Sequence, residues 1–493
     1  MDKIHVRKFS EVFLQANLDK SQYNELKPLM EFYAKDYKFS PAYKCSQWTG
    51  KISFLTRDGL FPIGLLSKFL KFCESYSYEP VLEFKVSEFG EKISEEFLQK
   101  FLEVVFPPSV NIFPYDHQIE AIQKAIFFGR GVLNLATSSG KSLIIYSLVR
   151  YLIAKGKKVI LIVPSISLVE QIYSDFKNDY GWNNVLDNVC LNYGGKILDL
   201  SKNVLITTWQ SVYKNDERFF EKYDALIVDE CHQMQGKSIS EIGKKCSKAK
   251  FRIGLTGSMP DNEADFNTVV GYLGPVIHKV MSKELIDKGI ISQIKIKNLI
   301  LRYPESMKIA RSSYQKEVDD INSYANRNLA LDHIVKNSKD TDNILILVTK
   351  IEHLRSIKIY LEKKFPKKVV HEIYGKTEAD VRENIRKGLE NESGSILVAS
   401  YGTFSTGVSV KKLHHIVLFS SYKSQIKILQ SIGRGLRKHE SKEYVTIFDV
   451  VDDCRYSDGK KTYNNFCYRH WKENRLGYYS EQEFEYENEF LDI

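Results

Sequence analysis

Residues 131–142 read GVLNLATSSGKS, an apolar run followed by a loop of small residues and by Gly-Lys-Ser. The run is typical of a buried strand, and the apolar periodicity of Leu143–Ala154 predicts a helix directly after the loop. A loop in this position aims its N–H groups and the N-terminus of the helix at one point, where they bind an anion. We therefore predict a phosphate cradle, although Leu135 replaces its usual opening glycine and an ordinary strand-to-helix turn is the alternative. The residues predicted to surround the phosphates are Thr137, Ser138, Ser139, Gly140, Lys141 and Ser142, of which Lys141 reaches the β and γ phosphates and Ser142 ligates magnesium.

Outward from this cradle, short apolar runs alternate with helical stretches along most of the chain. One series extends from Gly131 to Asp229, and a second of the same kind extends from Ile344 to Phe448. Short strands separated by helices of this length are typical of parallel sheets with helical crossovers. Residues 1–106 differ, because their segments are amphipathic and their middle is basic and aromatic. The sequence predicts an α/β protein with two tandem parallel-sheet domains preceded by a small α+β domain, and the predicted domains are 1–106, 107–290 and 291–455, with a C-terminal extension 456–493.

A pair of acidic residues follows another apolar run of the first series. The run Ala225–Val228 ends in Asp229 and Glu230, and strands of a parallel sheet end at the same edge, so the pair is expected beside the cradle. There Asp229 can bind magnesium and Glu230 can polarise the attacking water, two roles that hydrolysis of a γ phosphate requires. Two solvated loop residues are the alternative interpretation.

Three polar residues near the end of the second series complete the predicted site. Gln430, Arg434 and Arg437 lie in the stretch QSIGRGLR. Arginine side chains can neutralise the charge that develops on a transferred phosphoryl group, and supplying them from a second domain makes hydrolysis depend on closure of the cleft between the domains. Taken alone, the two arginines could instead be surface cations.

The distribution of charge favours a polyanionic partner. The net charge is +9, and the excess of Lys and Arg lies mainly behind the middle of the chain, ahead of an acidic end. In the N-terminal domain, Lys38, Lys44 and Lys51 are interleaved with aromatic residues such as Tyr37 and Trp48, which is typical of nucleic-acid contacts. An ordinary half-buried sheet with its aromatic residues on one face is the alternative.

The end of the chain carries two further patterns. Lys460–Tyr479 interleaves basic and aromatic residues, and is either a DNA-contacting extension or a helix packed on the second α/β domain. From Glu481 to Phe490, glutamates alternate with aromatic residues at a period of two, which predicts an edge strand with one glutamate face. An acidic tail that binds a partner is the alternative.

The cysteine content and the hydropathy pattern indicate the cellular compartment. The seven cysteines are scattered and form no CxxC pair, so neither a disulfide framework nor a zinc site is indicated. No uncharged run approaches the ~18 residues that span a bilayer, and the charged first ten residues precede no apolar stretch. We therefore expect a cytoplasmic protein with no membrane partner.

The ordered set of motifs resembles the superfamily 2 helicases and translocases over roughly residues 110–450, which implies two RecA-like domains. In this resemblance Gln118 corresponds to the adenine-reading glutamine, Lys141 and Ser142 to motif I, and Asp229 and Glu230 to motif II. The resemblance further implies nucleic-acid contacts at Ser165, Gln171, Thr207, Thr208 and Thr403, a nucleotide contact at Gly407, and catalytic roles for Gln430, Arg434 and Arg437 of motif VI. Hydroxyl groups at strand ends suit phosphate contacts that read no sequence, although singly they are more often turn or helix-cap residues.

More narrowly, the stretches Val398–Gly407 and Arg434–His439, the motif spacing and the N-terminal residues Pro41, Trp48 and Gly50 resemble the UvsW family of large tailed phages. This resemblance implies an ATP-dependent DNA helicase or translocase that uses ATP and Mg²⁺ and moves 3′ to 5′. The implied substrates are stalled forks, Holliday junctions and displacement loops, remodelled in recombination and repair in the host cytoplasm. Expected partners are branched or single-stranded DNA, with single-strand-binding or recombination proteins as candidates, and the chain is expected to be a monomer. The alternatives are the motor of a restriction or excision-repair assembly, an RNA helicase and a non-catalytic nucleotide-gated DNA clamp.

Overall fold

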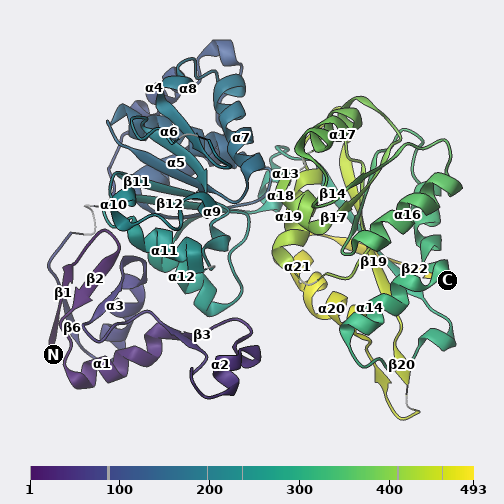
Figure 1. Cartoon of the computed structure of the whole chain (residues 1–493), viewed down its shortest axis with the longest axis horizontal. Coiled ribbons are helices and arrows are strands. Elements are labelled where there is room, and N and C mark those ends of the chain that lie inside the picture. The colour runs from purple at the N-terminus through teal and green to yellow at the C-terminus, as the bar shows by residue number, and fades with distance from the viewer. Residues whose placement is uncertain are drawn as a thin grey trace. The chain divides into compact units, whose positions relative to one another are not determined.

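The computed structural model describes residues 2–85, 89–196, 198–235, 237–407, 410–422, 424–457 and 459–493. The chain divides into two compact units (Figure 1). Unit 1 comprises residues 1–135 and 139–280, and unit 2 comprises residues 136–138 and 281–493. The boundary predicted at residue 290 therefore lies inside unit 2, because α13 (Ser282–Asp287) already belongs to that unit. In the described part of the chain no helix combines the length and the apolar composition that a membrane span needs.

The N-terminal part of unit 1 is a small α+β layer. Buried and exposed positions alternate along β1 (Lys3–Lys8), so that Ile4 and Val6 face the core while the intervening side chains face solvent. The sheet has the order β5-β2-β1-β6, with β6 parallel to β1 and the other neighbours antiparallel. Its other strands are β2 (Phe13–Ala16), β5 (Leu60–Pro62) and β6 (Glu79–Leu82), a separate two-stranded sheet pairs β3 (Glu31–Tyr33) with β4 (Lys51–Ser53), and the helices are α1 (Lys20–Leu26), α2 (Pro41–Lys44), α3 (Leu66–Ser75) and α4 (Glu95–Val105).

A seven-stranded parallel sheet forms the core of the rest of unit 1, in the order β13-β7-β12-β11-β8-β10-β9. Strand β8 (Val159–Val163) is buried along its whole length, as expected for a strand with helices on both faces. Because the strands are parallel, β7, β12 and β11, which are neighbours, end at the same edge. The other strands are β7 (Arg130–Leu135), β9 (Val189–Asn192), β10 (Val204–Thr208), β11 (Ala225–Asp229), β12 (Phe251–Thr256) and β13 (Val276–Val280), and the helices are α5 (Asp116–Phe128), α6 (Lys141–Ala154), α7 (Ile166–Ser174), α8 (Val185–Asn188), α9 (Trp209–Val212), α10 (Glu217–Phe220), α11 (Lys237–Lys245) and α12 (Glu263–Leu273).

Unit 2 contains a second seven-stranded parallel sheet, in the order β16-β17-β15-β18-β19-β14-β22. The two parallel sheets and the N-terminal layer confirm the predicted fold class. The strands are β14 (Gln293–Arg302), β15 (Ile344–Val348), β16 (Val370–Ile373), β17 (Ile396–Ser400), β18 (His415–Leu418), β19 (Tyr444–Asp453) and β22 (Tyr486–Asp492), a small hairpin pairs β20 (Tyr456–Ser457) with β21 (Thr462–Tyr463), and the helices besides α13 are α14 (Tyr314–Ser323), α15 (Leu329–Lys336), α16 (Ile351–Lys364), α17 (Ala379–Asn391), α18 (Tyr401–Gly407), α19 (Gln425–Gly435), α20 (Phe466–His470) and α21 (Leu476–Glu481).

The C-terminal segment completes unit 2. Strand β22 pairs with β14 at the edge of the sheet, which confirms an edge strand at this end of the chain. The strand begins at Tyr486, however, and the predicted start at Glu481 is instead the last residue of α21. Of the glutamates of β22, Glu487 pairs with Lys297 at 3.0 Å. In the preceding helical segment, Trp471 and Arg475 are buried, and Arg475 forms an ion pair with Asp449 of β19. Packing on the second sheet is therefore the correct interpretation of this helical segment.

The N-terminal layer shares a hydrophobic core with α12 of the parallel-sheet part of unit 1. Ala264 and Val270 of α12 pack in the same cluster as the apolar side chains of the small sheet. At Gly64, in the short 3₁₀ helix η3 (Ile63–Leu65), a Cβ atom would lie 1.8 Å from the carbonyl oxygen of Val270, so η3 and α12 touch backbone to backbone. Arg130 at the start of β7 also reaches across, with its guanidinium 3.3 Å from a carboxylate oxygen of Glu11. Residues 1–106 are thus docked on the parallel-sheet domain rather than tethered to it.

Candidate active site and nucleic-acid surfaces

The loop after β7 has the backbone that a phosphate cradle requires. Gly140 has a φ of 83° and Ser138 a φ of 69°, both in the left-handed region, and α6 begins directly afterwards at Lys141. A Cβ atom at Gly140 would lie 2.1 Å from Nε2 of Gln118, so a larger residue would displace that side chain as well as strain the backbone. The loop geometry therefore fits the nucleotide phosphates that the sequence predicts.

Gln118 braces this loop from α5. Its Oε1 accepts a hydrogen bond from the Tyr115 backbone N–H at 2.8 Å, and its Nε2 donates to the Ser139 carbonyl at 2.8 Å. His117 Nε2 lies 3.0 Å from the same carbonyl. The side chain of Gln118 is 4% exposed. The predicted adenine-reading role stays a prediction, and the structure adds a second role, because Gln118 holds the cradle in its curved conformation.

The acidic pair lies at the same edge of the sheet as the cradle. Asp229 is the last residue of β11 and lies opposite Leu255 of β12. The next residue of β12, Thr256, lies opposite Asn134 of β7, the strand that leads into the cradle. Glu230 follows with a φ of 49°, a left-handed conformation that turns the chain sharply at the strand end. Its backbone N–H donates to Oδ1 of Asp229 at 3.0 Å. The strained residue thus sits at the position proposed to activate water.

A chain of polar contacts joins the cradle to β11 and β12. The Lys141 ammonium lies 3.6 Å from Oε1 of Glu230, and Oε2 of Glu230 lies 3.4 Å from Nδ1 of His232. The same Nδ1 lies 3.0 Å from Oγ1 of Thr256, which donates to the Ser258 carbonyl at 2.8 Å. His232 and Thr256 are buried, while Lys141 and Glu230 are partly exposed, so only the β12 end of the chain is shielded from water. The lysine of motif I, the glutamate of motif II and the end of β12 are therefore joined by direct contacts. We name these residues, Lys141, Glu230, His232 and Thr256, the polar chain.

The environment of Asp229 suits a bound cation. Burial and the negative charge of Glu230 together raise the pKa of Asp229 to about 7, although the positive charge of Lys141 acts in the opposite direction. A second cation near this carboxylate would stabilise its ionised form. Asp229 and the Ser142 hydroxyl are hard oxygen ligands of the kind that Mg²⁺ prefers.

Ser142 has a neighbour that the sequence did not reveal. Its Oγ lies 2.9 Å from the hydroxyl of Tyr180, a buried residue that follows α7. No motif contains Tyr180, and only the folded chain brings it to the cradle.

Unit 2 carries the residues of predicted motif VI. Gln430 and Arg434 lie four residues apart on α19 and so share a helix face, while Arg437 follows two residues after the helix ends. The end of α19 is fixed by Lys442, whose ammonium donates to the carbonyls of Gly435 and Leu413 at 2.7 and 2.8 Å. The roles of Gln430, Arg434 and Arg437 in hydrolysis stay predictions.

Two of the predicted nucleic-acid contacts lie at neighbouring strand ends, and a third is a structural residue. Ser165 follows β8 and caps α7, with its Oγ accepting from the Leu168 N–H at 3.4 Å. Thr208, opposite Val163 at the end of β10, has its Oγ1 3.0 Å from Oγ of Ser211. Thr207 differs, because its side chain is fully buried and donates to the Asn192 carbonyl at 2.8 Å. In this structure β10 is covered on both faces and the Thr207 hydroxyl bonds within the sheet, so its contact with nucleic acid stays a prediction.

The remaining contacts predicted by family resemblance are found in two helices. Gln171 is exposed on α7, and Thr403 lies on α18 with its Oγ1 2.8 Å from Oγ of Ser400. Thr403 is 6% exposed and therefore almost completely buried. Gly407 is the last residue of α18. Their contacts with nucleotide or nucleic acid stay predictions.

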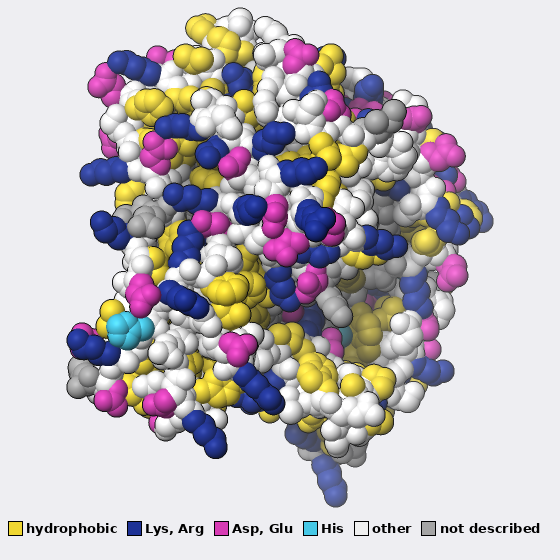
Figure 2. All heavy atoms as spheres, turned by 60° about the vertical axis from the view of Figure 1, so that its left-hand side comes forward, with side chains coloured by type: hydrophobic (Ala, Val, Ile, Leu, Met, Phe, Trp, Pro, Cys, Tyr) yellow, Lys and Arg dark blue, Asp and Glu magenta, His cyan; other side chains and the backbone are white. Residues whose placement is uncertain are grey.

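The N-terminal layer presents the predicted basic and aromatic surface. The rings of Tyr33 and Tyr37 stack at 4.5 Å, with Lys51 Nζ 5.2 Å from the first ring and Lys38 Nζ 5.9 Å from the second. Lys44 is exposed at the end of α2. Figure 2 shows Lys and Arg side chains spread between acidic ones over the face it brings forward, so positive charge there is distributed rather than gathered in one field.

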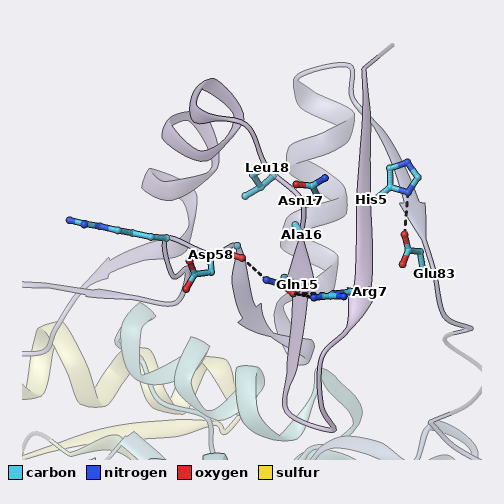
Figure 3. Close-up of a pocket in the computed structure, with 10 residues that line it drawn as sticks. His5, Arg7, Gln15, Ala16, Asn17, Leu18, Asp58 and Glu83 are labelled. Atoms are coloured by element: carbon cyan, nitrogen blue, oxygen red, sulfur yellow. Dashed lines mark hydrogen bonds and ion pairs between the residues drawn. The ribbon is translucent and has the colours of Figure 1, made fainter.

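A pocket of about 560 Å³ opens on the outer face of the small sheet, away from the predicted lysines. In Figure 3, Arg7 reaches Gln15, and Gln15 reaches the Asp58 backbone. His5 lies 3.2 Å from Glu83 in the same view. Four separate segments of the chain line this pocket, so no local sequence pattern indicates it.

Comparison with known proteins supports this assembly of motifs. Three family models match the chain: "DNA helicase UvsW, N-terminal" over residues 2–83, "Type III restriction enzyme, res subunit" over residues 111–261, and "Helicase conserved C-terminal domain" over residues 326–439. The chain is 25% identical over 363 residues to the DNA 3′-5′ translocase XPB2 of Sulfurisphaera tokodaii, covering 66% of this chain and 79% of the relative.

The similarity to one phage protein extends over nearly the whole chain. The ATP-dependent DNA helicase uvsW of Enterobacteria phage T4 is 32% identical over 500 residues, covering 98% of both chains. A crystal structure of T4 UvsW matches with a TM-score of 0.53 at 31% identity and covers 100% of each chain. These similarities include the N-terminal layer as well as both parallel-sheet domains. The chain therefore belongs to the UvsW family of ATP-dependent superfamily 2 DNA helicases.

Proposed function

We propose that this helicase remodels branched DNA, with stalled forks, Holliday junctions and displacement loops as substrates, during recombination and repair. The observation that carries the proposal is the polar chain, in which the cradle lysine, the acidic pair and the end of β12 are in contact. Such a chain of contacts can transmit the presence or absence of the γ phosphate to the strand ends where the candidate DNA contacts lie. A translocating motor requires this coupling, because hydrolysis of ATP must change the affinity with which the protein binds a DNA strand.

In the proposed reaction, Lys141 and the loop N–H groups bind the β and γ phosphates, and Glu230 orients and polarises the attacking water. Lys141 must leave its contact with Glu230 to reach a phosphate, and this exchange frees the carboxylate for the water. Magnesium, when bound, neutralises charge on the β and γ phosphates, and Ser142 and Asp229 are the residues that would hold it. Arg434 and Arg437 supply the positive charge for the transition state, and Gln430 contributes to water placement.

The DNA path is proposed to run past Ser165 and Thr208, whose neighbouring strands end at one edge of the sheet. Gln171 and Thr403 add contacts from α7 and α18. These groups contact phosphates without reading bases, as movement along any sequence requires. Branch preference is assigned to the N-terminal layer, through Lys38, Lys44, Lys51 and the rings beside them. The direction is proposed to be 3′ to 5′, the direction stated in the name of the related XPB2 translocase.

The phage origin of the T4 relative favours action in the cytoplasm of an infected host, on DNA held by single-strand-binding or recombination proteins. We propose that the chain acts there as a monomer.

The test is ATP hydrolysis and unwinding by the full chain on linear duplex, fork, four-way junction and RNA–DNA hybrid at one salt concentration. We expect the fork and the junction to stimulate hydrolysis and to be remodelled faster than linear duplex. Equal activity on every DNA would contradict the branched-DNA proposal, and stronger stimulation by RNA would contradict the choice of DNA.

The role of the N-terminal layer needs a different test from deletion. Because that layer shares a core with α12, removing residues 1–106 would expose Ala264 and Val270 and confuse lost binding with lost folding. Reversing the charge at the exposed residues Lys38 and Lys44 leaves the core intact. We expect weaker junction binding with a shallower salt dependence, because fewer phosphates are neutralised, and unchanged hydrolysis on single strands. Reversal at Lys3 and Lys20, on the same layer but away from the tyrosine stack, is the matched control.

A further inference from the structure

Tyr180 stands at the end of a helix whose last turn is unusual. Helix α7 continues into a π-helical turn over Asp175–Asp179, which closes with a hydrogen bond of 2.8 Å from the Tyr180 N–H to the Asp175 carbonyl. A π turn inserts an extra residue into a helix and changes the direction in which the following side chain points, and such turns occur frequently at functional sites. Here the turn places the Tyr180 side chain against the start of α6.

The ring of Tyr180 is held rigidly. Its centroid lies 4.9 Å from the ring of Tyr146 and 5.9 Å from the ring of Phe106, and the residue is 8% exposed. Tyr146 also donates from its hydroxyl to the Tyr180 carbonyl at 3.4 Å. A phenol fixed on two sides has little freedom to turn away, so the 2.9 Å distance between its hydroxyl and Oγ of Ser142 follows from the packing.

The chemistry of Ser142 gives this contact a purpose. A serine that ligates a cation does so through an oxygen lone pair, and its proton must then point to an acceptor on the other side. Groups that orient a ligand in this way are typical of metal sites, and their loss commonly weakens metal affinity by about 10- to 100-fold. The Tyr180 oxygen is an acceptor at hydrogen-bond distance from Ser142, and it approaches from protein rather than from solvent.

We propose that Tyr180 is a positioning residue for Ser142: its hydroxyl accepts the serine proton and keeps the serine lone pair directed at the magnesium ion that accompanies ATP. The inference rests on the proposed function, because it takes Ser142 to be a magnesium ligand. It goes beyond that function by assigning a role to a residue outside every helicase motif. Ser165 caps the start of α7 and Tyr180 follows the π turn that continues this helix, so one continuous segment joins a candidate DNA contact to the candidate metal ligand.

The experiment measures binding of a fluorescent, non-hydrolysable ATP analogue to the full chain as Mg²⁺ is titrated, and again in EDTA. Tyr180→Phe keeps the ring and removes the hydroxyl. We expect it to raise the Mg²⁺ concentration for half-maximal tight binding by about tenfold. Binding in EDTA is expected to be unchanged, which also shows that the variant is folded. Tyr151→Phe removes the hydroxyl of another buried tyrosine on α6, which donates to Glu91, and is expected to leave the Mg²⁺ dependence as it was.

A double variant separates positioning from general damage. If Tyr180 acts through Ser142, then Tyr180→Phe in a Ser142→Ala background adds no further loss. An unchanged Mg²⁺ dependence in Tyr180→Phe, or an equal loss in both backgrounds, overturns the inference. If Ser142→Ala itself leaves the Mg²⁺ dependence unchanged, the magnesium ligand of the proposed function is misassigned, and the inference about Tyr180 falls with it.

Discussion

Gly64 is the point at which the N-terminal layer meets α12 most closely, and replacing it tests how firmly the two are joined. In Gly64→Ala the new Cβ would lie 1.8 Å from the carbonyl oxygen of Val270 and 2.7 Å from its carbon. Contacts of a real Cβ essentially never fall below 3.0 Å, so η3 and α12 must separate by about 1.2 Å. Neither obstacle is a side chain that can swing away, because both atoms belong to the backbone.

The separation has an energetic cost that can be bounded. Inserting one carbon into a packed contact usually costs about 1–3 kcal/mol, and the upper part of that range applies where backbone must move. Around this contact, Ile63, Leu65 and Ala264 are almost completely buried and would lose part of their packing. We therefore expect about 2–3 kcal/mol, which corresponds to roughly 4–12 °C in the melting temperature of a unit this size.

The assay is thermal unfolding of the full chain, with hydrogen exchange at η3 and α12 as a local readout. Gly477→Ala on α21 is the matched control, because no atom lies within 4 Å of its added Cβ. That variant should be neutral or slightly stabilising, since alanine favours a helix. If Gly64→Ala melts within about 1 °C of the parent chain and its exchange is unchanged, the docking described here is wrong.

Four further outcomes are expected. Lys141→Ala should abolish phosphate release while DNA binding, measured by gel shift, survives, because the basic surfaces are untouched; normal turnover would remove Lys141 from the site. Glu230→Gln should keep ATP binding, lose hydrolysis and stay bound to DNA, whereas loss of ATP affinity as well would contradict its role with water. Arg434→Ala and Arg437→Ala should each slow turnover by at least about a thousandfold, and a mild effect of the second beside a severe effect of the first would reassign the arginine finger. Burial lowers the pKa of Lys442 from 10.5 to about 7, so the unfolded chain binds more protons between pH 7 and 10 and stability should rise across that window; Lys442→Met should flatten this rise in urea unfolding, and an unchanged slope would show that Lys442 is not its source.

The sequence predicted the cradle and the acidic pair because both are local signals. A strand, a loop of small residues and a helix are read from consecutive letters, and Asp229 follows its strand directly. Tyr180 could not be found in this way, since a π turn and an aromatic cluster place it beside Ser142. Thr207 shows what a motif position leaves out. The motif suggested a nucleic-acid contact, which stays a prediction, but it did not indicate that a parallel strand covered on both faces holds this hydroxyl inside the sheet.

The docking of the N-terminal layer was also beyond the sequence. Composition marked residues 1–106 as a separate domain. The two elements in contact, η3 and α12, are about 200 residues apart in the chain, and neither has a sequence pattern that indicates its contact with the other. Gly64 and Gly271 lie where η3 and α12 approach each other, but a glycine by itself is equally typical of a turn, a bulge or a helix end.

The position of β22 has a consequence for how the chain folds during synthesis. Strand β14 is the first strand of the unit 2 sheet in sequence order, but its neighbours in the sheet, β19 and β22, come last. The side chain of Asn298 in β14 donates a hydrogen bond to Asn488 in β22, which lies 190 residues later in the sequence. A ribosome adding about 5–20 residues per second needs roughly 10–40 s to make that stretch. Strand β19 is made before β22, so the edge of β14 that pairs with β22 is the last to be covered, while unit 1 already has all of its strands. A chain truncated before β22 would present this unpaired edge of β14 to other unfolded chains or to a chaperone.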